Sequence, residues 1–245
     1  MTQQPQRIWR INAYLILIAG VLAIAALALG LAGLVWDLLR PRVITNVVAP
    51  AGDARLRQER LSYHLRNAQG DVVVLDVLSD QTLDTAYSAK TLVDTLRNQL
   101  FVTLADGRST RLLADNQRLI VRVWAIRNTR VTSPHRSEHG DTPGESPDDT
   151  QPVRARLYEV VDADRNGDTR LSSSDPRRLL LARADGSAPV TLAENITQLD
   201  APALGAAGEL RLAATQADGG THLYRFDLHR WTALPPVALP SPSNP

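Results

Sequence analysis

Residues 99 to 113, QLFVTLADGRSTRLL, give the clearest indication of how this chain folds. Two segments, Gln99 to Leu104 and Arg108 to Leu113, are rich in apolar and β-branched residues, as strands typically are. They flank the pair Asp106-Gly107, which suits a tight hairpin because both central positions of such a turn favour positive φ. The stretch therefore predicts two antiparallel strands joined by a short turn.

Further strand-like segments lie on both sides of this hairpin. The run Asp71 to Val77 is short, apolar and β-branched, which is typical of a buried strand. A helix is expected from Leu83 to Leu100, where apolar residues recur at helical spacing, and a short one from Asp175 to about Ala182. The predicted fold class is mainly β with minor α, a mixed and mostly antiparallel β domain. Its remaining strands are predicted at residues 119–126, 154–161, 190–193, 209–213 and 221–228.

The tripeptide Ala-Asp-Gly occurs at residues 105–107, 184–186 and 217–219. Hairpins built on such turns resemble the blades of β-propellers, in which repeated units stack to share a core. Two or three such phrases are too few for a closed propeller of four-stranded blades. We therefore expect propeller-blade-like hairpins within the β domain, with chance recurrence of common turn residues as the alternative.

An uncharged, apolar run extends from Ile11 to Trp36. At about 1.5 Å per helical residue it is long enough to cross a hydrocarbon core of about 30 Å. We predict a short N-terminal tail at residues 1–12 and a transmembrane helix at residues 13–38. The alternative is a signal peptide cleaved after Ala28, although signal h-regions extend over only about 7–15 residues.

Composition divides the rest of the chain. Residues 131–153 contain three prolines before Gln151, several acids and almost no apolar residue. Such a segment cannot bury enough surface to offset the entropy lost on ordering, so we predict a disordered insertion there. It separates a first β module with one helix, residues 43–130, from a second β module, residues 154–234. A proline-rich tail follows at residues 235–245.

Oxygen-bearing side chains alternate along residues 164 to 175, which read DRNGDTRLSSSD. This arrangement suits Ca²⁺, a hard cation that binds six to eight oxygens at about 2.3–2.6 Å. Leu171, at the eighth position, is expected to pack into the core, and Asp162 offers a competing register that begins two residues earlier. The candidate calcium ligands are the side chains of Asp164, Asn166, Asp168, Ser172 and Asp175 and the backbone carbonyl of Arg170.

The pattern DxNxDxxLSxxD resembles the calcium loops of EF-hand proteins, and more closely those of dockerin-type repeats, which also end in aspartate and lead into a helix. The resemblance covers only the loop and implies a bound calcium ion. Thr169 stands where these loops place glycine for a sharp turn, and Pro176 stands where an apolar residue normally follows. The alternative is a solvated Asn-Gly-Asp turn that binds no ion.

Other kinds of chemistry find little support in the sequence. The chain has no cysteine, which excludes disulfides and thiolate sites. Its net charge of +1 gives no pull towards nucleic acid. His135-Arg136-Ser137-Glu138-His139 matches a zinc-protease pattern, but that chemistry needs a helix, and this segment lies in the predicted insertion.

These patterns together predict a membrane-anchored, non-enzymatic envelope protein. We expect a single pass through the bacterial inner membrane and a periplasmic or extracellular β domain that binds calcium and serves as a binding or structural module. The domain is placed outside because weak calcium sites fill only where the ion is abundant. A count of the arginines that flank the helix favours the opposite orientation, but long domains cross the membrane largely regardless of charge. Two alternatives stay open: a membrane-bound hydrolase that uses acids such as Asp76, or Asp162 with Asp164, and an accessory subunit that contacts an envelope protein.

Overall fold

The computed structural model describes residues 4–39, 42–50, 52–84, 90–132, 151–205 and 208–240. They belong to two compact units, which are considered separately: Met1–Arg42 with Asp84–Lys90, and Val43–Leu83 with Thr91–Pro245.

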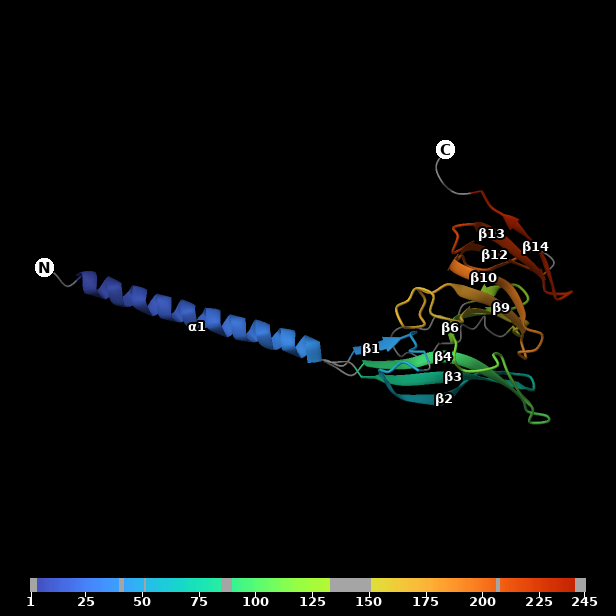
Figure 1. The fold of residues 1–245 in the computed structure, drawn as a ribbon, viewed down its shortest axis with the longest axis horizontal. Coiled ribbons are helices and arrows are strands. Elements are labelled where there is room, and N and C mark those ends of the chain that lie inside the picture. The colour runs from blue at the N-terminus through green and yellow to red at the C-terminus, as the bar shows by residue number, and fades with distance from the viewer. Residues whose placement is uncertain are drawn as a thin grey trace. The chain divides into compact units, whose positions relative to one another are not determined.

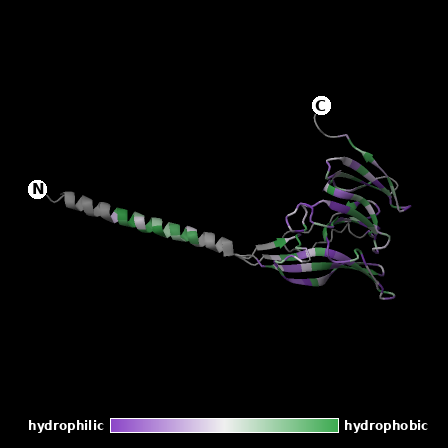
Figure 2. Ribbon diagram, in the orientation of Figure 1, coloured by the Kyte–Doolittle hydropathy of each residue, from purple (hydrophilic) through white to green (hydrophobic). Residues whose placement is uncertain are grey.

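The first unit contains one long helix, α1 (Gln4–Leu39) (Figure 1). Its segment Tyr14–Leu31 is long and apolar enough to cross a membrane, a test that an N-terminal signal sequence also passes. The side chains of this segment are exposed, and Figure 2 shows their apolar character along the helix. The predicted N-terminal apolar helix is therefore present, and it extends beyond the predicted bounds at both ends.

The second unit is built from strands in two sheets (Figure 1). Among the described residues, the five-stranded sheet has the order β1-β4-β3-β2, with β5 paired to β4. The nine-stranded sheet has the order β14-β13-β12-β10-β9-β8-β6-β7, with β11 paired to β12. The predicted mainly β, antiparallel fold class is thereby confirmed.

The first sheet comprises β1 (Arg42–Thr45), β2 (Leu56–Gln69), β3 (Val72–Leu83), β4 (Lys90–Thr103) and β5 (Ser109–Arg111). The second comprises β6 (Leu119–Ile126), β7 (Val131–Thr132), β8 (Ala155–Val161), β9 (Arg177–Arg183), β10 (Val190–Leu199), β11 (Ala203–Leu204), β12 (Glu209–Gln216), β13 (Thr221–Asp227) and β14 (Thr232–Ala238).

The two sheets share an apolar cluster to which β3, β4, β8 and β9 all contribute. A polar connection accompanies it: the hydroxyl of Tyr158 donates to Gln99 Oε1 at 2.7 Å, and Gln99 Nε2 donates to Asp76 Oδ1 at 2.7 Å. Burial raises the pKa of Tyr158, so its hydroxyl stays protonated and remains a donor. A second apolar cluster lies within the nine-stranded sheet and includes Leu179 and Ile196.

The three Ala-Asp-Gly phrases form the same kind of hairpin turn. They connect β4 to β5, β9 to β10 and β12 to β13. Their glycines, Gly107, Gly186 and Gly219, have φ of 69°, 78° and 87°, a region that glycine enters without steric cost. In each turn the aspartate accepts the N–H two residues further on. The predicted hairpin at Asp106-Gly107 is thus confirmed, although Gly107 has positive φ and Asp106 does not.

Both predicted helices of the β region are wrong. Within the segment Leu83–Leu100, Leu83 ends β3 and residues from Lys90 onwards form β4, which lies between β1 and β3. Pairing with two neighbours satisfies the backbone of β4, and this tertiary context outweighs the local helical spacing. Residues 177–183 form β9, whose Leu179, Leu180 and Leu181 are all buried, as in a strand covered on both faces.

The ends of the predicted insertion and tail also differ from expectation. In the predicted insertion 131–153, Val131–Thr132 pair with β6, and Val153 is buried and exchanges two hydrogen bonds with Gln69. Residues 133–150 lie outside the described residues. The predicted tail 235–245 begins inside β14, which contains its first two prolines, Pro235 and Pro236. Strand β14 lies at the edge of the sheet, where the missing N–H of proline is tolerated.

Candidate functional site

The candidate calcium loop, residues 164–175, connects β8 to β9. Leu171 is buried, as predicted, and packs with Val48, Leu119 and Val161. Leu171 and Val48 form an isolated antiparallel bridge outside the named strands. The apolar eighth position therefore fixes the middle of the loop to the body of the β unit.

The first half of the loop folds around its own acidic and amide oxygens. Asp164 accepts the N–H groups of Gly167 and Thr169, each at 2.7 Å. Asn166 Oδ1 accepts the N–H of Asp168 at 2.9 Å, and Asp168 Oδ1 accepts the N–H of Arg170 at 2.9 Å. Three of the predicted ligands thus hold the backbone in a succession of tight turns.

Asp175 closes the loop from its other end. Its side chain is buried, and its Oδ1 accepts the N–H groups of Arg165 at 2.9 Å and Asn166 at 3.2 Å. Its Oδ2 accepts the N–H of Ser172 at 3.0 Å. A buried carboxylate needs such partners, because an uncompensated charge is costly to remove from water. The twelfth position therefore ties the start of the loop to its end.

The remaining predicted ligands have different surroundings. Ser172 Oγ lies 2.6 Å from Ser174 Oγ, and Ser174 Oγ also accepts from Asn166 Nδ2 at 2.8 Å. Arg170 is half-buried, and its backbone N–H donates to Asp168. The structure thus engages both serine hydroxyls with one another rather than with the aspartates.

Thr169 occupies the position at which related loops carry glycine, and its φ is 63°. This left-handed conformation is unusual for a β-branched residue and explains the preference for glycine. The Thr169 hydroxyl donates to the carbonyl of Asp168 at 2.6 Å and accepts from Arg55 Nη2 at 2.7 Å. The sequence pattern thus located the strained position correctly.

Arg55 is a contact of the loop that the sequence did not reveal. Besides reaching Thr169, its Nη2 binds Asp53 Oδ2 at 2.8 Å. The hydrogen bonds from the side chain and the backbone N–H of Arg55 hold the pKa of Asp53 below its usual value. No local signal predicts this contact, because Arg55 and Thr169 are 114 residues apart.

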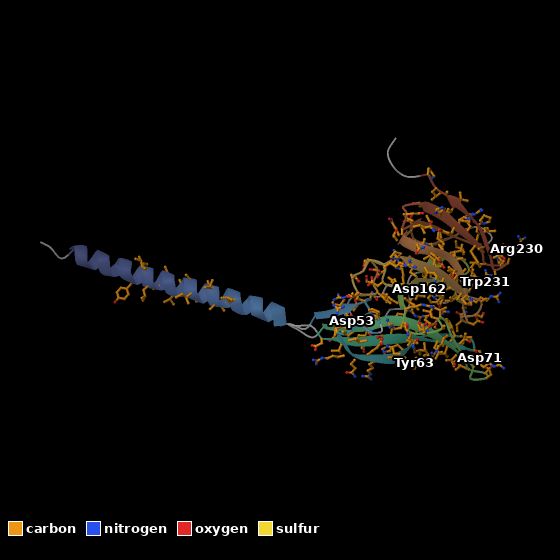
Figure 3. All side chains as sticks on the ribbon, in the orientation of Figure 1. Asp53, Tyr63, Asp71, Asp162, Arg230 and Trp231 are labelled. Atoms are coloured by element: carbon orange, nitrogen blue, oxygen red, sulfur yellow. The ribbon has the colours of Figure 1, made fainter. Side chains whose placement is uncertain are left out.

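Asp162 does not belong to the loop's hydrogen-bond system. Asp162, which is labelled in Figure 3, accepts from Arg178 at 2.8 and 2.9 Å and lies 3.1 Å from Arg118 Nε. Its carboxylate is therefore directed towards two guanidinium groups. These contacts favour the register that begins at Asp164 over the one that begins at Asp162.

The donor chemistry of the loop fits calcium. Its six predicted ligands are three carboxylates, one amide, one hydroxyl and one backbone carbonyl, all hard oxygen donors. Across the described parts of the chain, no group of three or more His, Cys, Asp or Glu side chains is arranged to hold a metal ion. This includes Asp164, Asp168 and Asp175, so the structure does not bring the three carboxylates of the loop together around one point.

A pocket of about 460 Å³ adjoins the loop. It brings Asp162 and Glu194 together with four arginines, and Ala163, Arg165 and Pro176 belong to or flank the loop. Asp76, the other acid considered for hydrolysis, lies elsewhere and binds Arg66 at 2.8 Å. The arginines that line the pocket are Arg118, Arg165, Arg177 and Arg178.

Comparisons with known proteins add little. No family model and no curated protein matches the chain. A solved structure described as the β-propeller domain of the Trilobed protease from Pyrococcus furiosus, with an open velcro topology, is similar at 8% identity and a TM-score of 0.30. The match covers 74% of this chain and 43% of that chain, so this chain spans less than half of its length.

Proposed function

We propose that this protein is a membrane-anchored, non-enzymatic component of the bacterial envelope whose β domain binds one calcium ion in the loop 164–175. Helix α1 would cross the inner membrane once, and the β domain would lie on the periplasmic or extracellular side. The domain would serve as a binding or structural module, with an envelope protein as its partner.

The closure of the loop by Asp175 carries the calcium proposal. Asp175 draws residues 165, 166 and 172 onto one buried carboxylate, which closes the loop. Asp164, which is half-buried, and Asp168, which is exposed, add two further carboxylates to the loop. A divalent cation bound by these carboxylates would offset their negative charge.

In this proposal, calcium supplies positive charge and oxygen coordination rather than a reaction. Asp164, Asn166 and Asp168 would bind it from the first half of the loop, and Asp175 would close the shell. The carbonyl of Arg170 and the hydroxyl of Ser172 would complete the set. Because Leu171 fixes the loop to Val48, ion binding would stiffen the domain rather than an isolated loop.

The contacts of the other acids support a non-enzymatic role. Asp162 is bound by two arginines, and Asp76 is bound by Arg66 and Gln99. A general acid or nucleophile has to be presented to a substrate, and these carboxylates are already engaged.

Isothermal titration calorimetry of the full-length chain in detergent tests the calcium proposal. We expect binding of one Ca²⁺ per chain and much weaker binding of Mg²⁺, which demands tighter octahedral geometry. Asp168→Ala should remove the calcium signal. Asp162→Ala removes the same negative charge, but Asp162 lies outside the loop's hydrogen-bond system. This variant should therefore keep the calcium signal. Equal binding by the two variants would refute the assignment.

Membrane attachment is tested by alkaline extraction of membranes from expressing cells, followed by N-terminal sequencing of the mature protein. An uncleaved α1 should keep the protein in the membrane pellet. A soluble product that begins after Ala28 would instead identify the helix as a signal sequence.

A further inference from the structure

Strand β2 is a long, exposed edge. It has 14 residues, and within the described residues it pairs only with β3, at the end of the five-stranded sheet. Its pairing with β3 is unbroken from Gln58 to Leu65, between two register shifts. Edge strands present unpaired backbone groups, and proteins usually blunt them with bulges or charges. Here the bulges lie at the ends and leave a regular central segment open.

The centre of this edge carries an apolar stripe. Leu61, Tyr63 and Leu65 are 47%, 60% and 68% exposed. Because side chains alternate along a strand, the three residues lie on one face of the sheet. Figure 3 labels Tyr63 on this strand. Outside α1, the other large apolar residues that the described chain exposes are Leu104, Val237 and Leu239, so β2 concentrates such surface.

The stripe is symmetric about Tyr63. If two copies of β2 pair in antiparallel fashion with Tyr63 opposite Tyr63, Leu61 of each copy lies opposite Leu65 of the other. A register centred on Ser62 instead places Leu65 opposite Glu59. Of these two registers, only the one centred on Tyr63 places every apolar side chain of the stripe opposite another. A surface that complements itself is what a two-fold interface requires.

The charges around the stripe are compatible with this register. Glu59 would lie near Asn67, which follows the register shift after Leu65, and its Oε1 is already held by Ser79 and Gln81. Arg60 would lie opposite Arg66, but Arg66 is bound to Asp76 at 2.8 Å, which neutralises it. No uncompensated pair of like charges results.

We propose that β2 is a self-association edge, on which a second copy of this chain adds its own β2 with Tyr63 on the two-fold axis. Backbone hydrogen bonds between the strands would supply affinity, and the apolar stripe would set the register. One short strand pair buries less than the roughly 800 Å² per partner of a standard interface, so the dimer should be weak and concentration-dependent.

The absence of cysteine from the chain allows a register-specific test. Directly opposite residues of antiparallel strands have Cα atoms about 4.5–5.5 Å apart, within the range of about 4.4–6.8 Å that a disulfide spans. Tyr63→Cys in the full-length chain in detergent should therefore give a disulfide-linked dimer on mild oxidation. Leu61→Cys alone should not, because the two positions 61 would be about 13 Å apart along the strands. A mixture of the Leu61→Cys variant with the Leu65→Cys variant should cross-link again, and both variants retain Tyr63.

Leu104→Cys is the matched control for random collision, since Leu104 is also largely exposed. We expect cross-linking to be at least tenfold faster at position 63 than at position 104. This difference should disappear when the Tyr63→Cys variant also carries Leu65→Lys. The cross-linking rates should be the same when calcium is removed. Failure of the self-association proposal is therefore distinguishable from failure of the calcium proposal. Equal rates at positions 63 and 104, or self-linking of Leu61→Cys as fast as that of Tyr63→Cys, would overturn the proposal. If β2 instead binds a different protein, positions 63 and 104 should cross-link at equal rates.

Discussion

Leu171 and Val48 exchange two backbone hydrogen bonds, from Val48 N–H to the Leu171 carbonyl at 2.9 Å and from Leu171 N–H to the Val48 carbonyl at 2.8 Å. Both residues are almost completely buried. They join the candidate calcium loop to the segment that precedes β2, and the contact of Arg55 with Thr169 reinforces this connection. A change in the loop should therefore alter the stability of the β unit as a whole.

Thr169→Gly should stabilise the fold by about 1 kcal/mol. A left-handed conformation costs a non-glycine residue about 1–2 kcal/mol, whereas the two exposed hydrogen bonds of the Thr169 hydroxyl contribute less. Calcium affinity should rise as well, because glycine adopts the required turn without strain. Urea denaturation and calorimetry measure the two effects. Ala188→Gly relieves a similar backbone strain, at φ of 48°, in a turn away from the loop, so it should stabilise without changing calcium affinity. A less stable Thr169→Gly variant would contradict the assignment of strain.

Local chemistry explains what the sequence predicted well. The Asp-Gly turns were predictable because their φ values depend on the residues of the turn itself. The strained position Thr169 was predictable for the same reason. The helix predicted from Leu83 to Leu100 failed because β4 is fixed by its neighbours, β1 and β3, which lie far away in the sequence. The contact between Arg55 and Thr169 was beyond prediction for this reason too.

The pair Asp53–Arg55 should give the β unit a stability that depends on pH. The pKa of Asp53 is lowered in the folded state, from an ordinary value of 3.8, mainly by its hydrogen bonds with Arg55. The contribution should therefore be present above about pH 4 and be lost as the pH falls through the lowered pKa. It should be small, because Arg55 is substantially exposed and solvent screens the pair. Arg55→Ala should be less stable than wild type in urea at pH 7, and the difference should shrink at pH 3. A difference that is the same at both pH values would contradict this account.

Glu159 should be one of the most sensitive residues of the second sheet. Its buried carboxylate accepts Trp124 Nε1 at 3.0 Å, binds Arg177 and lies 3.5 Å from Arg122 Nη1. Removing one partner from a buried ion pair leaves an uncompensated charge, so Glu159→Ala should cost about 3–5 kcal/mol of unfolding free energy. Glu194→Ala removes an exposed carboxylate from the same sheet and should cost less than about 0.5 kcal/mol. Urea denaturation that finds similar losses for both variants would show that the cluster around Glu159 contributes little.

Calcium-dependent melting of the full-length chain in detergent tests the central claim most directly. A ligand that binds only the folded state adds RT ln(1 + [L]/Kd), about 2.7 kcal/mol at a hundredfold excess over Kd. Millimolar Ca²⁺ should therefore raise the Tm of wild type measurably relative to a chelator, and Mg²⁺ should do so far less. Asp164→Ala should abolish the rise, and Asp162→Ala should preserve it. If wild type and Asp164→Ala melt alike with and without calcium, residues 164–175 form only a turn, and the calcium proposal is wrong.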